Sequence, residues 1–280
     1  MIDAAATTTS QPPWGTRRPG RLAAGWIALC RRLPPGPVSR RLGLWLRRPL
    51  KYRLAGPVDT QLWGLRLRLH PRGNLSEERW LFLPQFSDRI ERRLLAARLA
   101  PGAVFLDVGA NAGFYSFWVW SCFRDAVRIE AFEPDPELCA RIRFNVAANA
   151  IGSLHLHQLA LSDRAGTARL AIGAKNRGTN ALTDGDGGVE VPTVPLAGFV
   201  ADAAIGRIDA MKIDVEGHEP AILGHFFAHA PRSAFPRLLV CETLAHQART
   251  DPLRALIESA GYRQLARGRM NTVFELAPRP

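Results

Sequence analysis

The sequence is poor in cysteine and contains no long hydrophobic run. Its 280 residues include four cysteines, and none has the Cys-x-x-Cys or Cys/His spacing of a zinc or redox site: Cys30, Cys122, Cys139 and Cys241. We therefore expect neither structural zinc nor a disulfide framework, and a reducing, cytoplasmic compartment suits these thiols. No stretch approaches the roughly 20 apolar residues that a membrane-spanning helix needs.

Acidic residues are nearly absent from the first part of the chain. Residues 1–58 hold eleven arginines and lysines and one acid, Asp3, so they carry ten of the twelve units of net positive charge. The basic character therefore belongs to an arm and says little about an active site. We expect residues 1–56 to form a partly disordered or helical arm, with short amphipathic helices over Arg21–Leu33 and Val38–Tyr52. This arm either packs on the rest of the chain or contacts an anionic membrane or a nucleic acid.

The pattern changes after the arm. Residues 57–100 predict a small β/α lead-in that packs on the core, because Gln61–His70 alternates apolar and polar residues like a half-exposed strand and Asp88–Leu99 has one apolar helical face. From residue 101 to 280 strands and helices alternate, which indicates an α/β domain with a mostly parallel sheet of seven strands closed by an antiparallel pair. We expect Gly173–Pro195, rich in Gly, Asn and Asp, to be a long loop.

The domain is organised around one glycine-containing turn. The run Val104–Val108 is typical of a strand buried on both faces, and we expect a helix over Phe114–Phe123. Between them lie Asp107, Gly109, Asn111 and Gly113, which allow the backbone torsions and close approach that a ligand-binding turn needs. The amides of the next helix then point at the ligand. An ordinary left-handed turn between strand and helix is the alternative.

Two further strand ends carry acids. Glu133 follows the second strand about 20 residues after the turn, where an acid in nucleotide-binding folds accepts hydrogen bonds from ribose hydroxyls. Ser162 and Asp163 follow the third strand, near the place of an adenine. The alternatives are a helix-entry acid for Glu133 and a simple polar turn for Ser162-Asp163.

A fourth cluster is suited to proton transfer. Asp214, Glu216 and His218 follow the strand Ile208–Ile213 at the ligand-binding edge, where they can place and deprotonate an acceptor hydroxyl. They can equally cap the next helix. We assign no metal ligand here, although a divalent cation stays open because Asp and Glu are its usual ligands.

Two residues are candidates for the acceptor pocket. Glu242 ends the fifth strand and either lines the pocket or pairs with an arginine. Asn180 belongs to Asn176–Asn180, which is either an acceptor loop or plain disorder.

Taken together, four motifs resemble the FkbM-type methyltransferases in order and spacing. They are Asp107-Val-Gly-Ala-Asn-Ala-Gly113, Glu133-Pro134, Ala160-Leu-Ser-Asp163 and Lys212-Ile-Asp-Val-Glu-Gly-His-Glu219. The resemblance covers Leu62 to Leu276 and implies a class I, Rossmann-like methyltransferase fold. It also implies S-adenosylmethionine as methyl donor and O-methylation of a sugar, glycolipid or polyketide-type metabolite. One departure is that Thr243-Leu-Ala separates Glu242 from His246, which puts a catalytic role for His246 in doubt.

Two other functions stay open. The arginine-rich arm suits an RNA methyltransferase, and it also suits a noncatalytic scaffold docked on a membrane. Acids retained at three strand ends favour the enzyme. The oligomeric state has no signal in the sequence.

Overall fold

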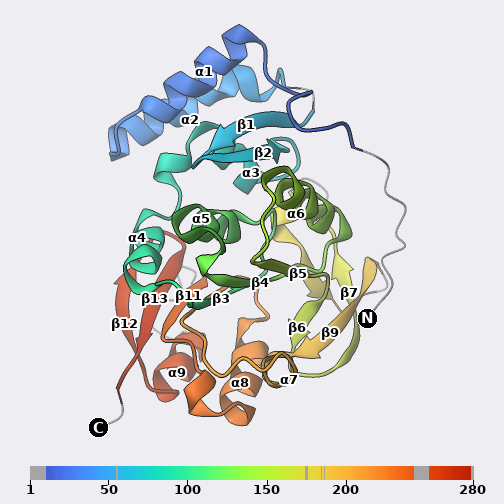
Figure 1. Cartoon of the computed structure of the whole chain (residues 1–280), viewed down its shortest axis with the longest axis vertical. Coiled ribbons are helices and arrows are strands. Elements are labelled where there is room, and N and C mark those ends of the chain that lie inside the picture. The colour runs from blue at the N-terminus through green and yellow to red at the C-terminus, as the bar shows by residue number, and fades with distance from the viewer. Residues whose placement is uncertain are drawn as a thin grey trace.

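A seven-stranded sheet forms the centre of the molecule (Figure 1). The structure is a computed structural model that describes residues 11–54, 56–173, 176–183, 185, 187–242 and 252–278. The strand order is β12-β13-β11-β10-β3-β4-β5, and β13 is antiparallel to both of its neighbours. The strands are β3 Val104–Val108, β4 Arg128–Phe132, β5 Leu154–His157, β10 Ala210–Ile213, β11 Leu238–Glu242, β12 Tyr262–Arg267 and β13 Asn271–Leu276. The predicted mostly parallel sheet with an antiparallel closing pair is confirmed.

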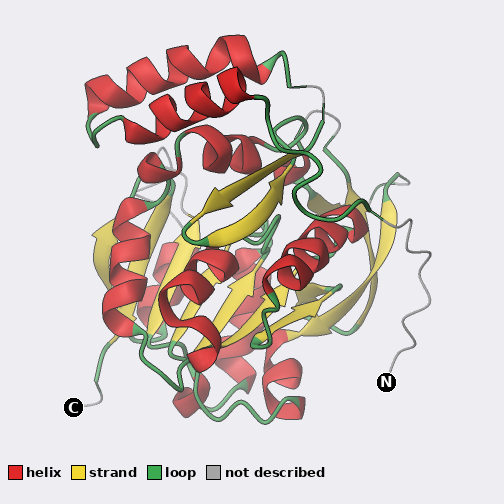
Figure 2. Cartoon of the chain, turned by 45° about the horizontal axis from the view of Figure 1, so that its top comes forward, coloured by secondary structure: helices red, strands yellow, loops and turns green. Residues whose placement is uncertain are grey.

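Helices cover both faces of this sheet (Figure 2). One face is covered by α4 Arg89–Arg98, α5 Phe114–Phe123 and α6 Pro136–Asn149, and the other by α7 Leu196–Asp202, α8 Glu219–His229 and α9 Pro252–Ser259. Successive residues of β3 feed the two cores in turn, since Phe105 packs in the first and Leu106 in the second. This double burial is the reason that β3 reads as an unbroken apolar run.

A second, four-stranded sheet corrects the expected long loop. Its strands are β6 Ala160–Ser162, β7 Gly166–Ala171, β8 Ala181–Thr183 and β9 Val189–Pro195, in the order β6-β9-β7-β8. The loop prediction for Gly173–Pro195 was wrong because the composition hid two short strands. In β9 the buried residues are Val191 and Thr193, two positions apart, with exposed neighbours, as in a strand with one buried face.

The lead-in differs from the single expected strand. Instead of one strand over Gln61–His70, the structure has a hairpin of β1 Val58–Leu62 and β2 Leu65–Leu69. Its two-residue turn has positive φ at Trp63 (53°) and Gly64 (76°), the geometry of tight hairpins. A tryptophan is an unusual first turn residue, so the sequence carried no clear turn signal.

Amide side chains of α6 attach this hairpin to the core. Asn145 accepts from the amide of Arg68 at 2.7 Å and donates to its carbonyl at 3.3 Å. Asn149 makes the same pair of bonds with Arg66, both at 2.8 Å. The two asparagines are four residues apart, on one helix face, so they pair with the free edge of β2 as a strand would.

The basic arm is helical and docked. Helices α1 Arg21–Arg32 and α2 Pro37–Lys51 lie side by side above the hairpin and α3 Leu75–Phe82 (Figure 1), close to the predicted helix positions. Arg47 and Lys51 both form salt bridges with buried Glu78 of α3. Gly43 packs so tightly that a Cβ there would lie 2.6 Å from Leu83.

A buried ion pair in the β1–β2 hairpin holds the start of the arm. Arg68 and Asp59 are each 2% exposed and form two hydrogen bonds, at 2.7 and 2.9 Å. Burial opposes charge on Asp59, but the Arg68 guanidinium and the amides of Arg17 and Gly15 hold the pKa of this carboxyl below its usual range. The same arginine donates to the carbonyls of Pro12 and Pro13.

Arg68→Ala is therefore expected to lower the free energy of unfolding by about 3–5 kcal/mol, because it leaves the Asp59 carboxylate buried without its partner. Urea denaturation measures this. The matched control is Arg254→Ala, which removes an exposed i,i+4 pair with Glu258 and should cost about 0.5 kcal/mol or less. Equal losses in the two variants would contradict the argument.

Candidate functional site

A cavity of about 420 Å³ opens at the carboxyl ends of β3, β4 and β10. Its wall comes from the β3–α5 turn, the end of β4 and the loop between β10 and α8. Residues of α2, α3, α4 and the β12–β13 turn complete it. Ligands in open parallel sheets bind at this edge, so the cavity lies where the sequence predicts the site.

The glycine-containing turn has the predicted backbone. Gly109 has φ of 71°, and a Cβ there would lie 2.0 Å from the carbonyl oxygen of Asp214, so no other residue fits. Asn111 is left-handed, with φ of 54°, and its amide donates to Glu133 at 2.7 Å. Gly113, with φ of 86°, starts α5. The turn thus joins the ends of β3, β4 and β10 through backbone contacts.

Asp107 lies behind this turn with no exposed surface. One of its oxygens accepts from the amide and hydroxyl of Ser116, at 3.0 and 2.6 Å. The other, Oδ1, has no hydrogen-bond partner among the described residues and lies 4.0 Å from the Lys212 ammonium. Burial raises the pKa of Asp107, and the lysine partly offsets this. The free oxygen leaves this carboxylate with capacity for a further donor.

Lys212 is a site residue that the sequence analysis did not single out. Its ammonium is buried, donates to the Gly109 carbonyl at 2.7 Å and lies 3.5 Å from Asp214 Oδ2. Burial alone would lower the pKa of this lysine, but Asp214 and Asp107 raise it above its usual value. The available signal was a lysine inside the otherwise apolar strand Ala210–Ile213.

Glu133 is in the wall of the cavity, where a ribose-binding acid is predicted. Its two oxygens accept from the amides of Asn111 (2.7 Å) and Asp135 (2.9 Å). Burial raises the pKa of Glu133 to about 8, although both amides favour the charged form. A carboxylate oxygen can accept more than one hydrogen bond, so Glu133 keeps acceptor capacity for a ligand hydroxyl.

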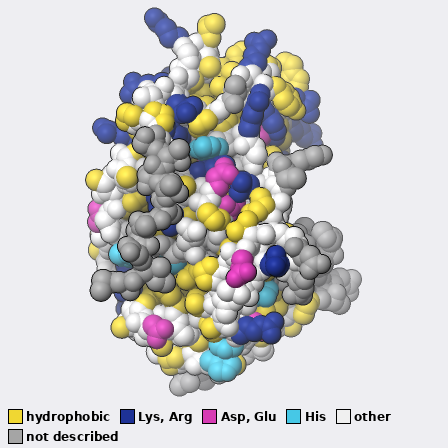
Figure 3. All heavy atoms as spheres, turned by 90° about the vertical axis from the view of Figure 1, so that its right-hand side faces the viewer, with side chains coloured by type: hydrophobic (Ala, Val, Ile, Leu, Met, Phe, Trp, Pro, Cys, Tyr) yellow, Lys and Arg dark blue, Asp and Glu magenta, His cyan; other side chains and the backbone are white. Residues whose placement is uncertain are grey.

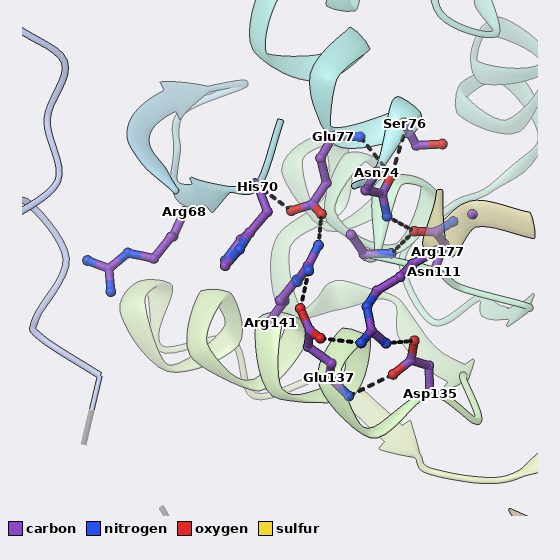
Figure 4. A network of polar contacts seen from close by, with 12 residues as sticks. Arg68, His70, Asn74, Ser76, Glu77, Asn111, Asp135, Glu137, Arg141 and Arg177 are labelled. Carbon is purple, nitrogen blue, oxygen red and sulfur yellow. Dashed lines mark hydrogen bonds and ion pairs between the residues drawn. The ribbon is translucent and has the colours of Figure 1, made fainter. Parts of the chain in front are cut away.

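A chain of ion pairs holds the surrounding loops (Figure 4). Arg141 of α6 bridges Glu77 of α3 and Glu137, and Arg177 bridges Glu137 and Asp135. Figure 4 also shows that the Asn74 side-chain amide donates a hydrogen bond to the Asn111 side-chain oxygen, at 2.6 Å. The lead-in, the turn and the 176–180 segment are therefore one connected polar network.

Asn180, predicted to contact the acceptor, is tied into this network. Its side-chain amide donates to Asp135 at 2.8 Å, and its oxygen accepts from the Gly173 amide at 2.9 Å. It also belongs to the cavity wall, so contact with an acceptor stays a prediction.

The structure gathers a different acidic cluster from the predicted one. Asp214, Glu216 and Glu242 each have a carboxylate oxygen within 4.8 Å of the others. Burial, then Asp214 and Glu216, raise the pKa of Glu242 to about 8. Glu216 has positive φ (54°), which turns it back toward the strand ends. The strand-end position of Glu242 was the signal that it belongs with these acids.

His218 and Ser162 are brought together instead. The imidazole Nε2 lies 3.1 Å from the Ser162 hydroxyl, which donates to Asp163 at 3.0 Å. His218 is in the cavity wall with Asp214 and Glu216, whereas the Asp163 side chain is about half exposed. The adenine contact of Ser162 and Asp163 stays a prediction. His246 lies outside the described residues.

The strand order, the left-handed turn and the carboxylates at the strand ends define a class I methyltransferase. The Methyltransferase FkbM domain model matches residues 107–264, and the chain belongs to that family. It is similar to the 31-O-demethyl-FK506 methyltransferase FkbM of Streptomyces tacrolimicus, at 29% identity over 182 residues, which cover 54% of this chain and 69% of that protein. It is also similar to the 2-O-methyltransferase NoeI of Sinorhizobium fredii, at 26% identity over 158 residues, or 50% of this chain and 64% of that one.

Solved methyltransferases resemble the chain at low identity. The METTL16 methyltransferase domain is 13% identical with a TM-score of 0.48, covering 91% of this chain and 80% of that one. The precorrin-6y C5,15-methyltransferase of Geobacter metallireducens is 13% identical with a TM-score of 0.43, covering 69% and 90%.

The raised pKa of Glu133 predicts a pH-dependent stability. Between about pH 5 and 8 Glu133 keeps its proton in the folded protein but has lost it in the unfolded chain. The contribution of protonated Glu133 to the free energy of unfolding is therefore full at low pH and is lost as pH rises through the folded pKa. We expect the free energy of unfolding to fall by on the order of 2–5 kcal/mol over this range. Urea denaturation from pH 5 to 8.5 measures how the free energy of unfolding changes with pH. Glu133→Gln should flatten this dependence, whereas the surface variant Glu258→Gln should leave it unchanged. An unchanged slope in Glu133→Gln would refute the assignment.

Proposed function

We propose that the protein transfers a methyl group from S-adenosylmethionine to a hydroxyl of a sugar, glycolipid or polyketide-type acceptor. The observation that carries this proposal is the cavity itself, which is lined by carboxylates at the strand ends of a class I methyltransferase fold. The names of both relatives specify methylation at an oxygen. This favours an oxygen acceptor over a base nitrogen.

The residues present fit the cofactor. S-adenosylmethionine carries a sulfonium and an ammonium, and the site offers several carboxylates around one buried lysine, with an Asp107 oxygen still free. Opposite charge in a low-dielectric cavity favours such a ligand. The residues that would hold it are those predicted from the sequence: Asp107, Gly109, Asn111, Gly113, Glu133, Ser162 and Asp163.

The protein's own part in the reaction is acceptor placement and proton removal. When bound, the cofactor supplies an electrophilic methyl carbon, and its carbon–sulfur bond breaks with the electron pair staying on sulfur. Asp214, Glu216 and His218 place the acceptor hydroxyl in the cavity. As the new carbon–oxygen bond forms, the hydroxyl proton passes to the carboxylate cluster that Glu242 completes. A pKa of about 8 matches that acceptor to its task.

Calorimetry tests the cofactor assignment. Wild-type protein should bind S-adenosylmethionine saturably, and Glu133→Ala should weaken binding by about tenfold or more, because ribose hydroxyls lose a hydrogen-bond acceptor. Glu275→Ala, at the far end of β13, is the control and should bind like wild type. The assignment fails if wild type shows no saturable binding, or if both variants bind equally well.

Kinetics tests the proton acceptor. Once an acceptor is found, Asp214→Asn and Glu242→Gln should each lower kcat by about 100-fold or more while cofactor affinity is kept. Wild-type rate should rise with pH toward about 8, because the base must be unprotonated, and Glu242→Gln should lose this rise. His218→Gln separates the roles: a loss as large as that of Glu242→Gln would make the imidazole the base instead. Parallel assays with a chelator show whether the carboxylates act through a divalent cation.

A further inference from the structure

The outer faces of α1 and α2 carry two apolar stripes. On α1 the stripe is Leu22, Trp26 and Leu29, and on α2 it is Val38, Leu42 and Trp45. In both helices the spacing is i, i+4, i+7, which puts the three side chains on one face. Leu22 is 93% exposed, Val38 77% and Trp45 64%. Seven of the eleven exposed large hydrophobic residues in the described part of the chain lie in these helices or at Tyr52 just after them.

The two stripes adjoin each other. The Trp26 indole reaches from α1 to α2 and donates to the Leu46 carbonyl at 2.7 Å. The opposite side of α2 faces the protein, where Gly43 is buried and Arg47 and Lys51 pair with Glu78. The stripes are thus not the side by which the arm docks on the core, and isolated apolar exposure does not explain a periodic pattern in two neighbouring helices.

Arginines without acidic partners accompany the stripes. Arg21, Arg32, Arg41 and Arg48 are exposed and form no salt bridge with any described acid. Figure 3 shows Lys and Arg side chains gathered with hydrophobic ones at the top of the molecule, where Figure 1 places these helices. Apolar side chains beside unpaired arginines are the pattern of a helix that lies in the interface of an anionic bilayer.

We propose that the α1–α2 pair lies on an anionic lipid bilayer, with its stripes in the interface and these four arginines against the headgroups. A second copy of the chain is a poorer occupant, because it would bring two arginine groups together. RNA is poorer too, because four of the six stripe residues are Leu or Val, and aliphatic side chains offer RNA neither charge nor stacking. In the described residues no helix is long and apolar enough to cross the bilayer, so the pair lies on it.

The cavity extends as far as helix α2, which carries one of the two stripes. Arg40 and Leu44, on the side of α2 away from its stripe, belong to the cavity wall. A bilayer against the stripe of α2 would therefore be separated from the cavity wall by the width of this one helix, about 10 Å. Resting on the proposed function, the acceptor is then a hydroxyl of a membrane-borne amphiphile rather than of a freely diffusing metabolite.

Vesicle sedimentation of the full chain tests the anchor. Wild type should bind vesicles of phosphatidylcholine with phosphatidylglycerol much better than phosphatidylcholine alone, and added salt should weaken binding. Leu42→Glu/Trp45→Glu and, separately, Arg41→Glu/Arg48→Glu should each weaken it by about tenfold or more. Val189→Glu is the matched control, because it adds a charge at an exposed valine on β9. Cofactor affinity should be unchanged in all three, which shows that they fold.

Three results would overturn the anchor. One is wild-type protein that ignores the anionic vesicles. Another is a stripe variant that binds them like wild type. The third is sedimentation equilibrium showing a wild-type dimer that the stripe variant dissociates, since a second copy would then cover the stripes.

Labelled cofactor tests acceptor delivery separately. Lipids extracted from cells that naturally contain this protein are presented in anionic vesicles. Wild type should methylate these lipids faster than Leu42→Glu/Trp45→Glu does. The two proteins should be equal when the lipids are presented in detergent micelles, because the bilayer no longer matters there. Equal rates in vesicles, or no labelled lipid from either protein, would refute a membrane-borne acceptor. If wild-type protein does not bind the cofactor at all, that result would instead refute the proposed function.

Discussion

The site depends on how its buried carboxylates are kept compatible with one another. Asp107 and Glu133 are buried, Asp214 is 35% exposed, and all three interact electrostatically with Lys212, in a place where like charges repel. The buried ammonium of Lys212 lies between Asp107 and Asp214 and also holds the Gly109 carbonyl. One cation thus connects β10 to the turn after β3 and offsets part of the repulsion. The Asp107 oxygen that has no hydrogen-bond partner among the described residues is suited to a positively charged group of a ligand.

The turn also depends on residues that precede the matched methyltransferase domain. Asn74 caps α3 with its oxygen and donates to Asn111 with its nitrogen, so the start of a lead-in helix sets the position of the ligand turn. Glu77, with a pKa raised to about 7 by burial, is held by Arg141 of α6. The lead-in therefore acts as a support for the site and is more than an attachment point for the arm.

The sequence predicts the parts of the molecule that local rules decide. Strand Val104–Val108 and helix Phe114–Phe123 begin and end as expected, because an apolar run and a glycine turn mark them without tertiary help. The hairpin turn at Trp63 and strand β9 were missed, since sheet pairing overrides weak local signals there. The sequence spacing along one loop predicted that His218 groups with Asp214 and Glu216. In the structure the direction of the backbone decides which side chains meet, so that Glu242 from another strand joins the two acids and His218 contacts Ser162.

Charge is segregated along this chain. The arm holds most of the net positive charge, whereas Asp107, Glu133, Asp214 and Glu242 lie at the carboxyl ends of the central strands. On the two proposals above, an anionic bilayer meets α1 and α2, whereas the cationic cofactor meets the carboxylates at the strand ends. A uniformly basic chain of the same composition would have no such separation, so the placement of the acids matters more to function than the total charge.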